Sequence, residues 1–414
     1  MSEWMGHAPI IGSKLPAGKQ ERAIIAQIEY HQTMSEHHPT KNSTPEHPEL
    51  RQATVMLGDL TDDLLWPKLL RAPALALAPS RVLAGAICAF LLSVILQIAT
   101  IAEPAEGEPP TGFFSELLAV TNGLERAINH LASSALELDP FGFASALQSS
   151  AIFLRQTVMH SPMVALLIGI PFIAILSIAG GAIARSCAIE FAHGRFAPSD
   201  DTLGFALRRA RHFVLAVVGP VVLCATVLLI IALGGLLLSV PVLDVLGSIL
   251  YAIALLLGIG VTLVLVLHVL ALPMIVPALA VEGTDAFDAI QRSYAYVIAK
   301  PLRYLSYALL MLVLAVLAGT IFTMLAAAAI EMTDWAAAYF ESESTIRALS
   351  GEGDQGATKA TAHAIITIWR TIVSLAATGY AISLFFTSST LLYLAVRRIC
   401  DGQDINEIWE DSSN

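Results

Sequence analysis

The stretch Leu246–Ile275 reads LGSILYAIALLLGIGVTLVLVLHVLALPMI and contains no Asp, Glu, Lys or Arg. About 20 consecutive apolar residues are enough for a helix to cross the hydrocarbon core of a bilayer. The stretch therefore predicts a transmembrane helix, and the rest of the chain has to be read as part of a membrane protein.

Five other stretches have the same character. The six predicted spans are Val82–Ala102, Met163–Ala184, Phe213–Val240, Leu246–Ile275, Tyr304–Ile330 and Thr371–Val396. Pro241–Asp244 and one further residue separate the third and fourth runs, so these two spans form a tight hairpin. The predicted fold class is all-α: a polytopic membrane helical bundle of about six transmembrane helices with interfacial helices and an extracytoplasmic helical hairpin.

The composition argues against several classes of function. The 414 residues are 56% hydrophobic and 14% charged, whereas soluble proteins carry roughly 25% charged residues. The net charge of −11 argues against nucleic acid as a partner, because phosphate binding needs concentrated Lys and Arg. The chain has no nucleophile-elbow, zinc-protease or phosphate-loop motif. We therefore expect no enzyme, no catalytic residue and no cofactor.

The potential metal ligands are poorly arranged for a metal site. The four cysteines lie within or beside apolar stretches and form no CxxC pair: Cys88, Cys187, Cys224 and Cys400. They are typical of buried thiols rather than of disulfides or zinc ligands. Four histidines of the N-terminal region are only loosely grouped: His31, His37, His38 and His47. We predict no metal ion, since metal sites need tighter spacing or a folded scaffold.

The distribution of Lys and Arg predicts how the chain is threaded. Basic residues concentrate after the second and fourth spans, at Arg185–Arg211 and Arg292–Arg303, and after the last span, at Arg397–Arg398. The segments 103–162 and 331–362 carry mainly acids among their charged residues. We expect both termini in the cytoplasm and the chain in a cell membrane, the bacterial inner membrane.

The predicted organisation has four parts: a disordered cytoplasmic tail at 1–54, an amphipathic interfacial helix at 55–80, the membrane domain at 81–400 and an acidic cytoplasmic tail at 401–414. The first part is too polar to bury a core. Leucines at helical spacing in Val55–Leu70 predict a short helix. This helix either lies on the membrane surface, with Trp66 at headgroup depth, or packs on the cytoplasmic ends of the spans.

Segments 103–162 and 331–362 are the predicted extracytoplasmic loops. In the longer one, apolar residues from Phe114 to Leu131 recur at helical spacing, and a second helix is expected from about Phe143 to Met159. We predict a helical hairpin that either packs on the outer ends of the spans or binds a partner.

The two basic loops resemble each other. Ala188-Ile189-Glu190 in one loop matches Ala280-Val281-Glu282 in the other, and Phe205–Ala210 matches Asp288–Ser293. In each loop an acid ends a span, a short capped helix follows, and a basic turn leads into the next span. This pattern predicts an internal repeat of one helix–interfacial helix–helix unit.

A family resemblance rests on two short patterns. The run Leu272–Pro277 continues through Glu282, Ala286, Ala289 and Arg292–Tyr294, and the last span closes with Tyr393–Arg398 followed by Asp401-Gly402. Over residues 160–405 the chain resembles certain bacterial multi-pass membrane proteins of unassigned function, including the membrane domain joined to some glycerophosphodiester phosphodiesterases. The resemblance implies the topology, but it implies no catalytic residue, since no phosphodiesterase domain is attached.

Two acids at matching positions, Glu190 and Glu282, are candidate functional residues. They either bind a cation or relay protons, or they pair with loop arginines and hold the short helices in place. The arginines considered as partners are Arg185, Arg208, Arg209 and Arg292.

Two further candidates lie in or beside apolar runs. His268 either acts inside the membrane or bonds to a neighbouring helix. Arg370 either acts within the membrane or, with Trp369, marks the outer interface as a snorkelling side chain. Among the prolines, Pro273 and Pro277 are expected to break the end of the fourth span, and Pro220 to kink the third.

Two functions are compatible with these features. The first is a non-enzymatic protein that organises the membrane or a membrane-protein complex, with the lipid bilayer and a membrane-protein partner as its contacts. The second is a transporter-like protein for a small or lipidic solute. The second function requires His268, Glu190 or Glu282 to face a water-accessible cavity.

Overall fold

The computed structural model describes residues 65–101, 112–137, 139–239, 243–339 and 357–409. All of them belong to the compact unit Thr61–Asn414. Every regular element among the described residues is a helix, which confirms the all-α prediction. The predicted tail at 1–54, its histidines and most of Val55–Leu70 lie outside the described residues.

Six of the described helices are long and apolar enough to cross a membrane, which indicates a multi-pass membrane protein. They are α5 (Pro79–Ile101), α8 (Pro162–His193), α10 (Ala210–Gly235), α11 (Leu243–Glu282), α13 (Pro301–Ala338) and α15 (Ala357–Asp401). Several begin or end beyond the predicted spans. For example, α15 begins at Ala357 rather than Thr371, because the preceding residues include good helix formers and no Gly or Pro.

The expectation that Pro273 and Pro277 break the fourth span is wrong. Both residues lie inside α11, which continues to Glu282. Neighbouring helices bury this part of α11, and the Tyr304 hydroxyl of α13 donates to the Leu270 carbonyl in the turn before Pro273. Packing and a side-chain donor therefore stabilise a helix that proline would weaken in water.

The helical hairpin predicted in 103–162 is formed by α6 (Phe113–Leu136) and α7 (Pro140–His160). Asp139 caps α7 by accepting a hydrogen bond from the Phe141 amide at 3.0 Å. Leu117 and Leu118 of α6 share a buried cluster with Val164 of α8. The hairpin thus packs on the spans through α6.

The remaining elements of the described residues are four short helices and one turn: α3 (Leu65–Leu69), α4 (Ala72–Ala76), α9 (Ser199–Arg208), α12 (Ala286–Ala299) and the 3₁₀ turn η1 (Leu236–Ser239). Leu69 and Ala72 are buried in the main core. The orders α8–α9–α10 and α11–α12–α13 both place one short helix between two long ones.

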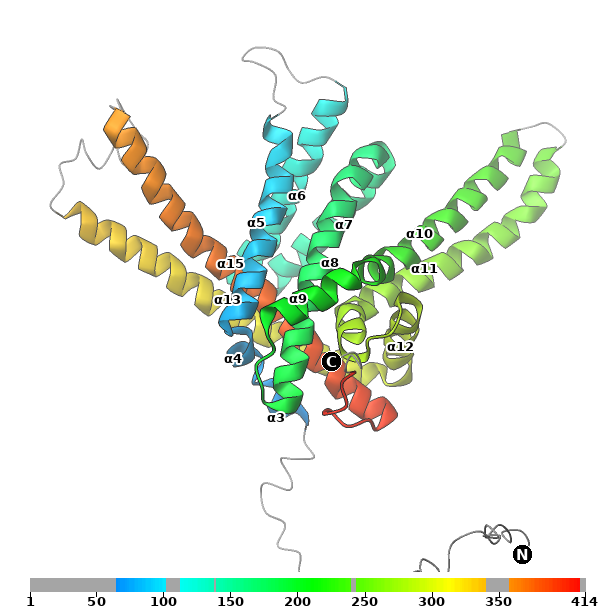
Figure 1. The fold of residues 1–414 in the computed structure, drawn as a ribbon. Coiled ribbons are helices and arrows are strands. Elements are labelled where there is room, and N and C mark those ends of the chain that lie inside the picture. The colour runs from blue at the N-terminus through cyan, green and yellow to red at the C-terminus, as the bar shows by residue number, and fades with distance from the viewer. Residues whose placement is uncertain (1–64, 102–111, 138, 240–242, 340–356, 410–414) are drawn as a thin grey trace, which may run out of the picture. The chain divides into compact units, whose positions relative to one another are not determined.

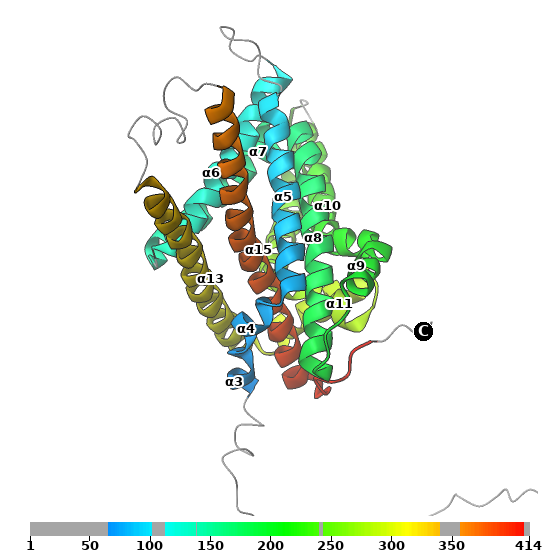
Figure 2. The ribbon, with the colours of Figure 1, turned by 60° about the vertical axis from the view of Figure 1, so that its left-hand side comes forward.

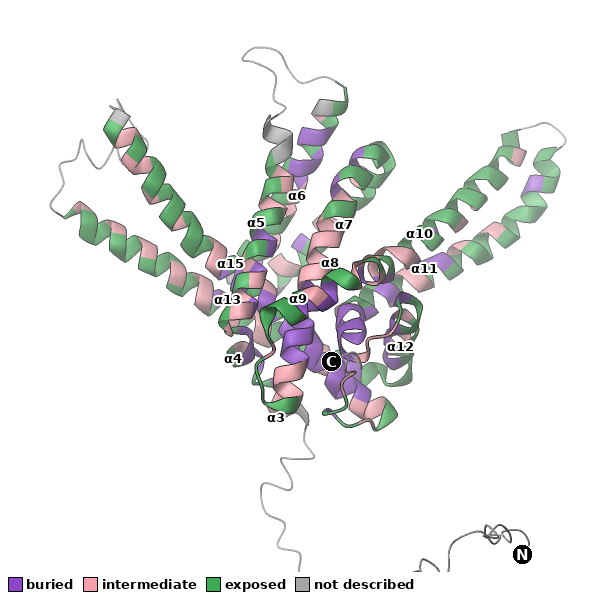
Figure 3. Ribbon diagram, in the orientation of Figure 1, coloured by how far each residue is buried: buried purple, intermediate pink, exposed green. Residues whose placement is uncertain are grey.

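The long helices meet at one end of the unit, where α5 begins and α15 ends (Figure 1). We call this the basal end. Figure 2 shows α15 beside α5 and α8, and the buried residues concentrate at the basal end in Figure 3. The second half of α15 lies at the centre of the core, where Leu391, Tyr393 and Leu394 are fully buried.

The backbones of α5 and α15 approach each other closely at two glycines. A Cβ atom added to Gly85 would lie 2.2 Å from the Gly379 carbonyl oxygen. Only glycine fits at this crossing, as is common where membrane helices pack tightly.

Candidate functional site

Two buried ion pairs connect the helices at the basal end. Arg81 at the start of α5 donates to Oε2 of Glu190 in α8 at 2.6 Å. Arg397 near the end of α15 donates to Oε1 of Glu282 in α11, also at 2.6 Å. Both arginine side chains are 1% exposed. Because an unpaired buried charge is costly, each pair has to form when the helices assemble.

The Glu282 pair extends into a network. Glu282 also accepts a hydrogen bond from the Tyr393 hydroxyl at 3.0 Å and lies 3.7 Å from Nη1 of Arg292. Arg397 donates further to the carbonyls of Asp404 and Glu407 at 2.7 and 2.6 Å. This network fixes the C-terminal segment, Gly402–Trp409, against the end of α15.

The structure gives both candidate acids an arginine partner that the sequence analysis did not identify. Arg292, a partner predicted from the sequence, does approach Glu282, whereas Arg397 was interpreted only as a marker of topology. Arg81, which lies 109 residues before Glu190, was not predicted as a partner. The signal was that Arg81 and Arg397 stand where the first span begins and the last one ends.

Titrating groups on α12 reinforce this network. The Tyr296 hydroxyl donates to the Asp401 carboxylate, and burial together with that hydrogen bond raises the pKa of Tyr296. Burial lowers the pKa of Arg292, but the nearby Glu282 carboxylate raises it, and the net effect is a raised pKa. At neutral pH the phenol therefore stays protonated and the guanidinium stays charged.

Groups from three other elements cap the C-terminus of α11. Arg185 of α8 donates to the Ala280 carbonyl at 3.1 Å, and the Trp409 amide donates to the Val281 carbonyl at 3.0 Å. Arg209 donates to the carbonyls of Gly283 and Thr284, at 2.5 and 3.2 Å. Cationic side chains suit this position because the last carbonyls of a helix carry partial negative charge.

Trp409 lies between the two capping arginines. The guanidinium carbons of Arg209 and Arg185 lie 4.8 and 5.8 Å from its ring centroid, and the Phe205 ring is 6.0 Å away. Arg185 also donates to the Trp409 carbonyl at 2.5 Å. Cation–π contacts and hydrogen bonds thus hold the C-terminal segment against α8, α9 and α11.

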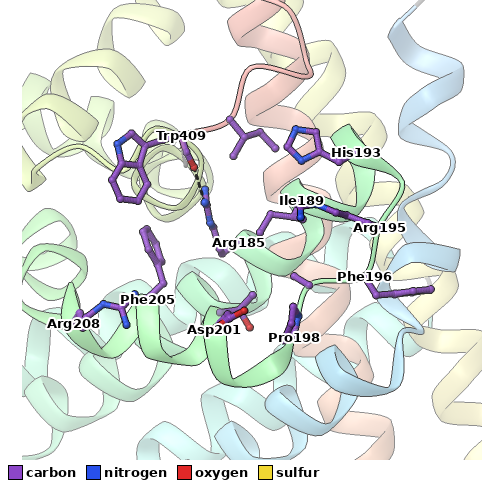
Figure 4. Close-up of a pocket in the computed structure, with 13 residues that line it drawn as sticks. Arg185, Ile189, His193, Arg195, Phe196, Pro198, Asp201, Phe205, Arg208 and Trp409 are labelled. Atoms are coloured by element: carbon purple, nitrogen blue, oxygen red, sulfur yellow. Dashed lines mark hydrogen bonds between the residues drawn. The ribbon is translucent and has the colours of Figure 1, made fainter. Parts of the chain in front are cut away.

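A basic pocket of about 710 Å³ lies between the end of α8, the following loop, α9 and the C-terminal segment (Figure 4). Its charged lining consists of Arg185, Arg195, Arg208 and Asp201, and its other side chains include His193, Phe196, Phe205 and Trp409. Asp201, Phe205 and Arg208 come from one face of α9, as their spacing requires. The described part of the lining thus holds three arginines and one aspartate, and each of these arginines also interacts with other residues of the chain.

This pocket was not predicted from the sequence. Arg195 was interpreted only as a marker of topology, Arg208 also as a possible partner of the two acids, and Trp409 belonged to a tail described by its acidity. The available signal was the apolar trio Ile405, Ile408 and Trp409 within that tail, of which Ile405 is buried and Trp409 lines the pocket.

The structure places His268 in a packed environment. Its side chain is 4% exposed. Nε2 lies 3.0 Å from the Val217 carbonyl of α10, and Nδ1 lies 2.9 Å from the Tyr294 hydroxyl of α12. Since a carbonyl can only accept, Nε2 carries the proton and Nδ1 accepts from Tyr294. His268 thus bonds to neighbouring helices, as one of its two interpretations expected.

Arg370 forms an ion pair between two of the long helices. Its Nη2 lies 2.7 Å from Oδ1 of Asp334 in α13, and both side chains are partly exposed. The pair links α15 to α13 away from the basal end, and Arg370 does not approach Glu190, Glu282 or the basic pocket.

Potential metal ligands are dispersed in the part of the chain that the structure describes. There, no group of three or more His, Cys, Asp or Glu side chains is placed to hold a metal ion. Cys88, Cys187 and Cys224 are buried free thiols, and Cys400 is partly exposed.

Comparison of the chain with protein-family models, with curated proteins and with solved structures finds no match. The resemblance over residues 160–405 therefore stays a prediction, and the chain is assigned to no family.

Proposed function

We propose that this chain is a non-enzymatic membrane protein that organises the bilayer or a membrane complex by holding an anionic group in the basic pocket. The observation that carries the proposal is the concentration of Arg185, Arg195 and Arg208 around one cavity. The pocket is built on a base that buried ion pairs and the α11 cap hold in place. Such a preorganised base lowers the cost of binding.

The proposal includes the orientation of the chain in the membrane and the internal repeat predicted from the two basic loops. The basic loops favour a cytoplasmic basal end, and a bacterial inner membrane is the proposed location. The repeat hypothesis gains support from the two acids, since Glu190 and Glu282 each pair with an arginine from outside the four spans α8, α10, α11 and α13.

The packing of the polar candidates favours the organising function over transport. His268 bonds to two neighbouring helices, and Glu190 and Glu282 bond to buried arginines. None of these three residues lines the basic pocket. A solute flux into proteoliposomes that depends on His268 would overturn the proposal in favour of the transporter.

The direct test is a titration of inorganic pyrophosphate against the protein in nanodiscs of phosphatidylcholine alone. We expect binding that weakens with salt, and a loss of about 1 kcal/mol for each arginine removed in the Arg195→Ala/Arg208→Ala variant. Both side chains are exposed, so the variant should fold.

The matched control is Lys300→Ala/Arg303→Ala, which removes the same charge from exposed residues of the corresponding loop. It should bind pyrophosphate like the parent protein. Equal weakening in both double variants would show a general charge effect and contradict a pocket.

A further inference from the structure

An apolar groove of about 430 Å³ lies between α5 and α8, and α9 closes its basal end. Leu83 and Ile87 line it from α5, Ala179 from α8 and Leu203 from α9. Its lining extends along α5 from Ser80 to Leu91, a distance of about 16 Å at the helical rise. The groove therefore has the length and polarity of a site for a hydrocarbon chain.

The groove adjoins the basic pocket at the first turn of α9. Pro198 lines the pocket, Ser199 lines the groove, and Thr202 lines both. Thr202 is buried, and its hydroxyl donates to the Ser199 carbonyl at 3.1 Å. The pocket and the groove therefore adjoin on either side of the first turns of α9.

The geometry points to one anionic phospholipid as the ligand, with its phosphate beside Arg195 and Arg208 and one acyl chain in the groove. This inference rests on the proposed function and names the ligand class of the same pocket. Asp201 opposes an anion there, and among the described residues that line the pocket it stands against three arginines.

Two observations favour a lipid over a soluble anion. The walls of the groove, α5 and α8, are helices long and apolar enough to span a membrane, so acyl chains are the surrounding medium. The basic pocket lies at the end of α8, one of these two helices, where headgroups gather and attract Lys and Arg.

The two cavities contribute differently to binding. An acyl chain gains little by leaving the bilayer for the groove, because lipid tails are as apolar as the groove side chains. The shape of the groove therefore retains the lipid, and the arginines select its charge.

The test is native mass spectrometry of the full chain after incubation with equimolar phosphatidylglycerol and phosphatidylcholine of identical chains. We expect retention of phosphatidylglycerol over phosphatidylcholine, and persistence of that preference with excess inorganic phosphate. Arg195→Ala/Arg208→Ala should lower the preference about fivefold for each arginine. Lys300→Ala/Arg303→Ala should leave it unchanged.

A second set of variants fills the groove. Ala179→Trp should remove the retained lipid while pyrophosphate still binds the pocket, and Leu203→Trp, at an exposed position of the same groove, repeats the test if the first variant misfolds. The control Ala232→Trp, on an exposed position of α10, should retain lipid like the parent protein.

Three results would overturn the lipid site. Retention of the lipid by the groove-filled variants would contradict an acyl chain in the groove. An unchanged preference for phosphatidylglycerol in Arg195→Ala/Arg208→Ala would contradict a headgroup in the pocket. The pyrophosphate titration would decide the proposed function separately. The third result is a preference for phosphatidylglycerol that appears only in Glu410→Gln/Asp411→Asn. It would show that, in the parent protein, the arginines bind the two carboxylates that follow Trp409 in the sequence.

Discussion

At the scale of single residues, several polar side chains of the long helices donate hydrogen bonds to backbone carbonyls of neighbouring helices. Three carbonyls that precede a proline by three residues accept a hydrogen bond from another helix: Val217 before Pro220 from His268, Leu270 before Pro273 from Tyr304, and Ala76 before Pro79 from Ser383. Pro220 and Pro273 lie inside helices, where the missing amide and the proline ring weaken the preceding turn, and these side-chain donors add a hydrogen bond in that turn. His268 thus has a structural role, because it links α11 to the turn of α10 that precedes Pro220.

The Arg81–Glu190 pair should behave as a coupled unit. Arg81→Met or Glu190→Leu alone should lower the free energy of unfolding by about 3–5 kcal/mol, because each leaves one charge without its partner. The double variant should lose less than the sum, as measured by denaturant unfolding in detergent micelles. Strictly additive losses would contradict the coupling that the 2.6 Å contact implies.

Tyr294 should contribute to alkaline unfolding. Burial raises the pKa of Tyr294 from 10.0 to about 12, so the folded protein holds this proton more tightly than the unfolded chain. The stabilisation is complete below pH 10 and is lost as the pH rises towards about 12.

Tyr294→Phe should therefore show a smaller drop in thermal stability between pH 10 and 12 than the parent protein. At pH 7 it should cost about 1 kcal/mol, because the hydrogen bond to His268 is lost. Tyr251→Phe, at an exposed position, is the control. Parallel pH profiles for Tyr294→Phe and the parent protein would refute the assignment.

At the scale of elements, the end of α11 depends on a glycine. Gly283 has a φ of 60°, and a Cβ atom there would lie 2.5 Å from Cδ2 of Trp409. Gly283→Ala should lower the free energy of unfolding by about 1–3 kcal/mol through backbone strain and displacement of the tryptophan. Gly402→Ala is the control, because its φ is 68° and its Cβ meets open space. Equal losses in the two variants would exclude a contribution from Trp409.

The crossing of α5 and α15 allows a similar comparison. Gly85→Ala should cost about 1–3 kcal/mol, because the new methyl group collides with the Gly379 backbone. Gly319→Ala, on α13 with open space around its Cβ, should be neutral or slightly stabilising. Thermal unfolding of both variants measures the difference, and a stable Gly85→Ala protein would show that the crossing tolerates a wider separation.

Hydropathy predicted the long helices because apolar length is a local property of the chain. The helix-breaking tendency of proline, also a local property, gave a wrong prediction at Pro273 and Pro277, where the buried surroundings of α11 outweigh the local cost of proline. The Arg81–Glu190 pair and the contact of Trp409 with α11 join residues far apart in the sequence, and no local pattern specifies them. The basic pocket was missed for the same reason, since α8, α9 and the C-terminal segment build it together.

At the scale of the whole molecule, the predicted threading can be tested by chemical labelling. In a background without the four native cysteines, Met332→Cys should react with an impermeant maleimide applied to intact cells. Ser199→Cys should react only after permeabilisation, because basic loops face the cytoplasm. Both positions are exposed, so accessibility of the thiol does not bias the comparison. The reverse labelling pattern would invert the proposed orientation.

The helix at the centre of the core is also the last of the six long helices in the chain. Because a ribosome makes proteins from the N-terminus, α5, α8, α10, α11 and α13 enter the membrane before α15 exists. Until then Glu282 lacks Arg397, and Gly85 lacks the helix that it crosses. The order of synthesis therefore delays part of the assembly: α10 can pack on α11 as soon as both helices are made, but the crossing of α5 and the partner of Glu282 have to wait for the sixth helix.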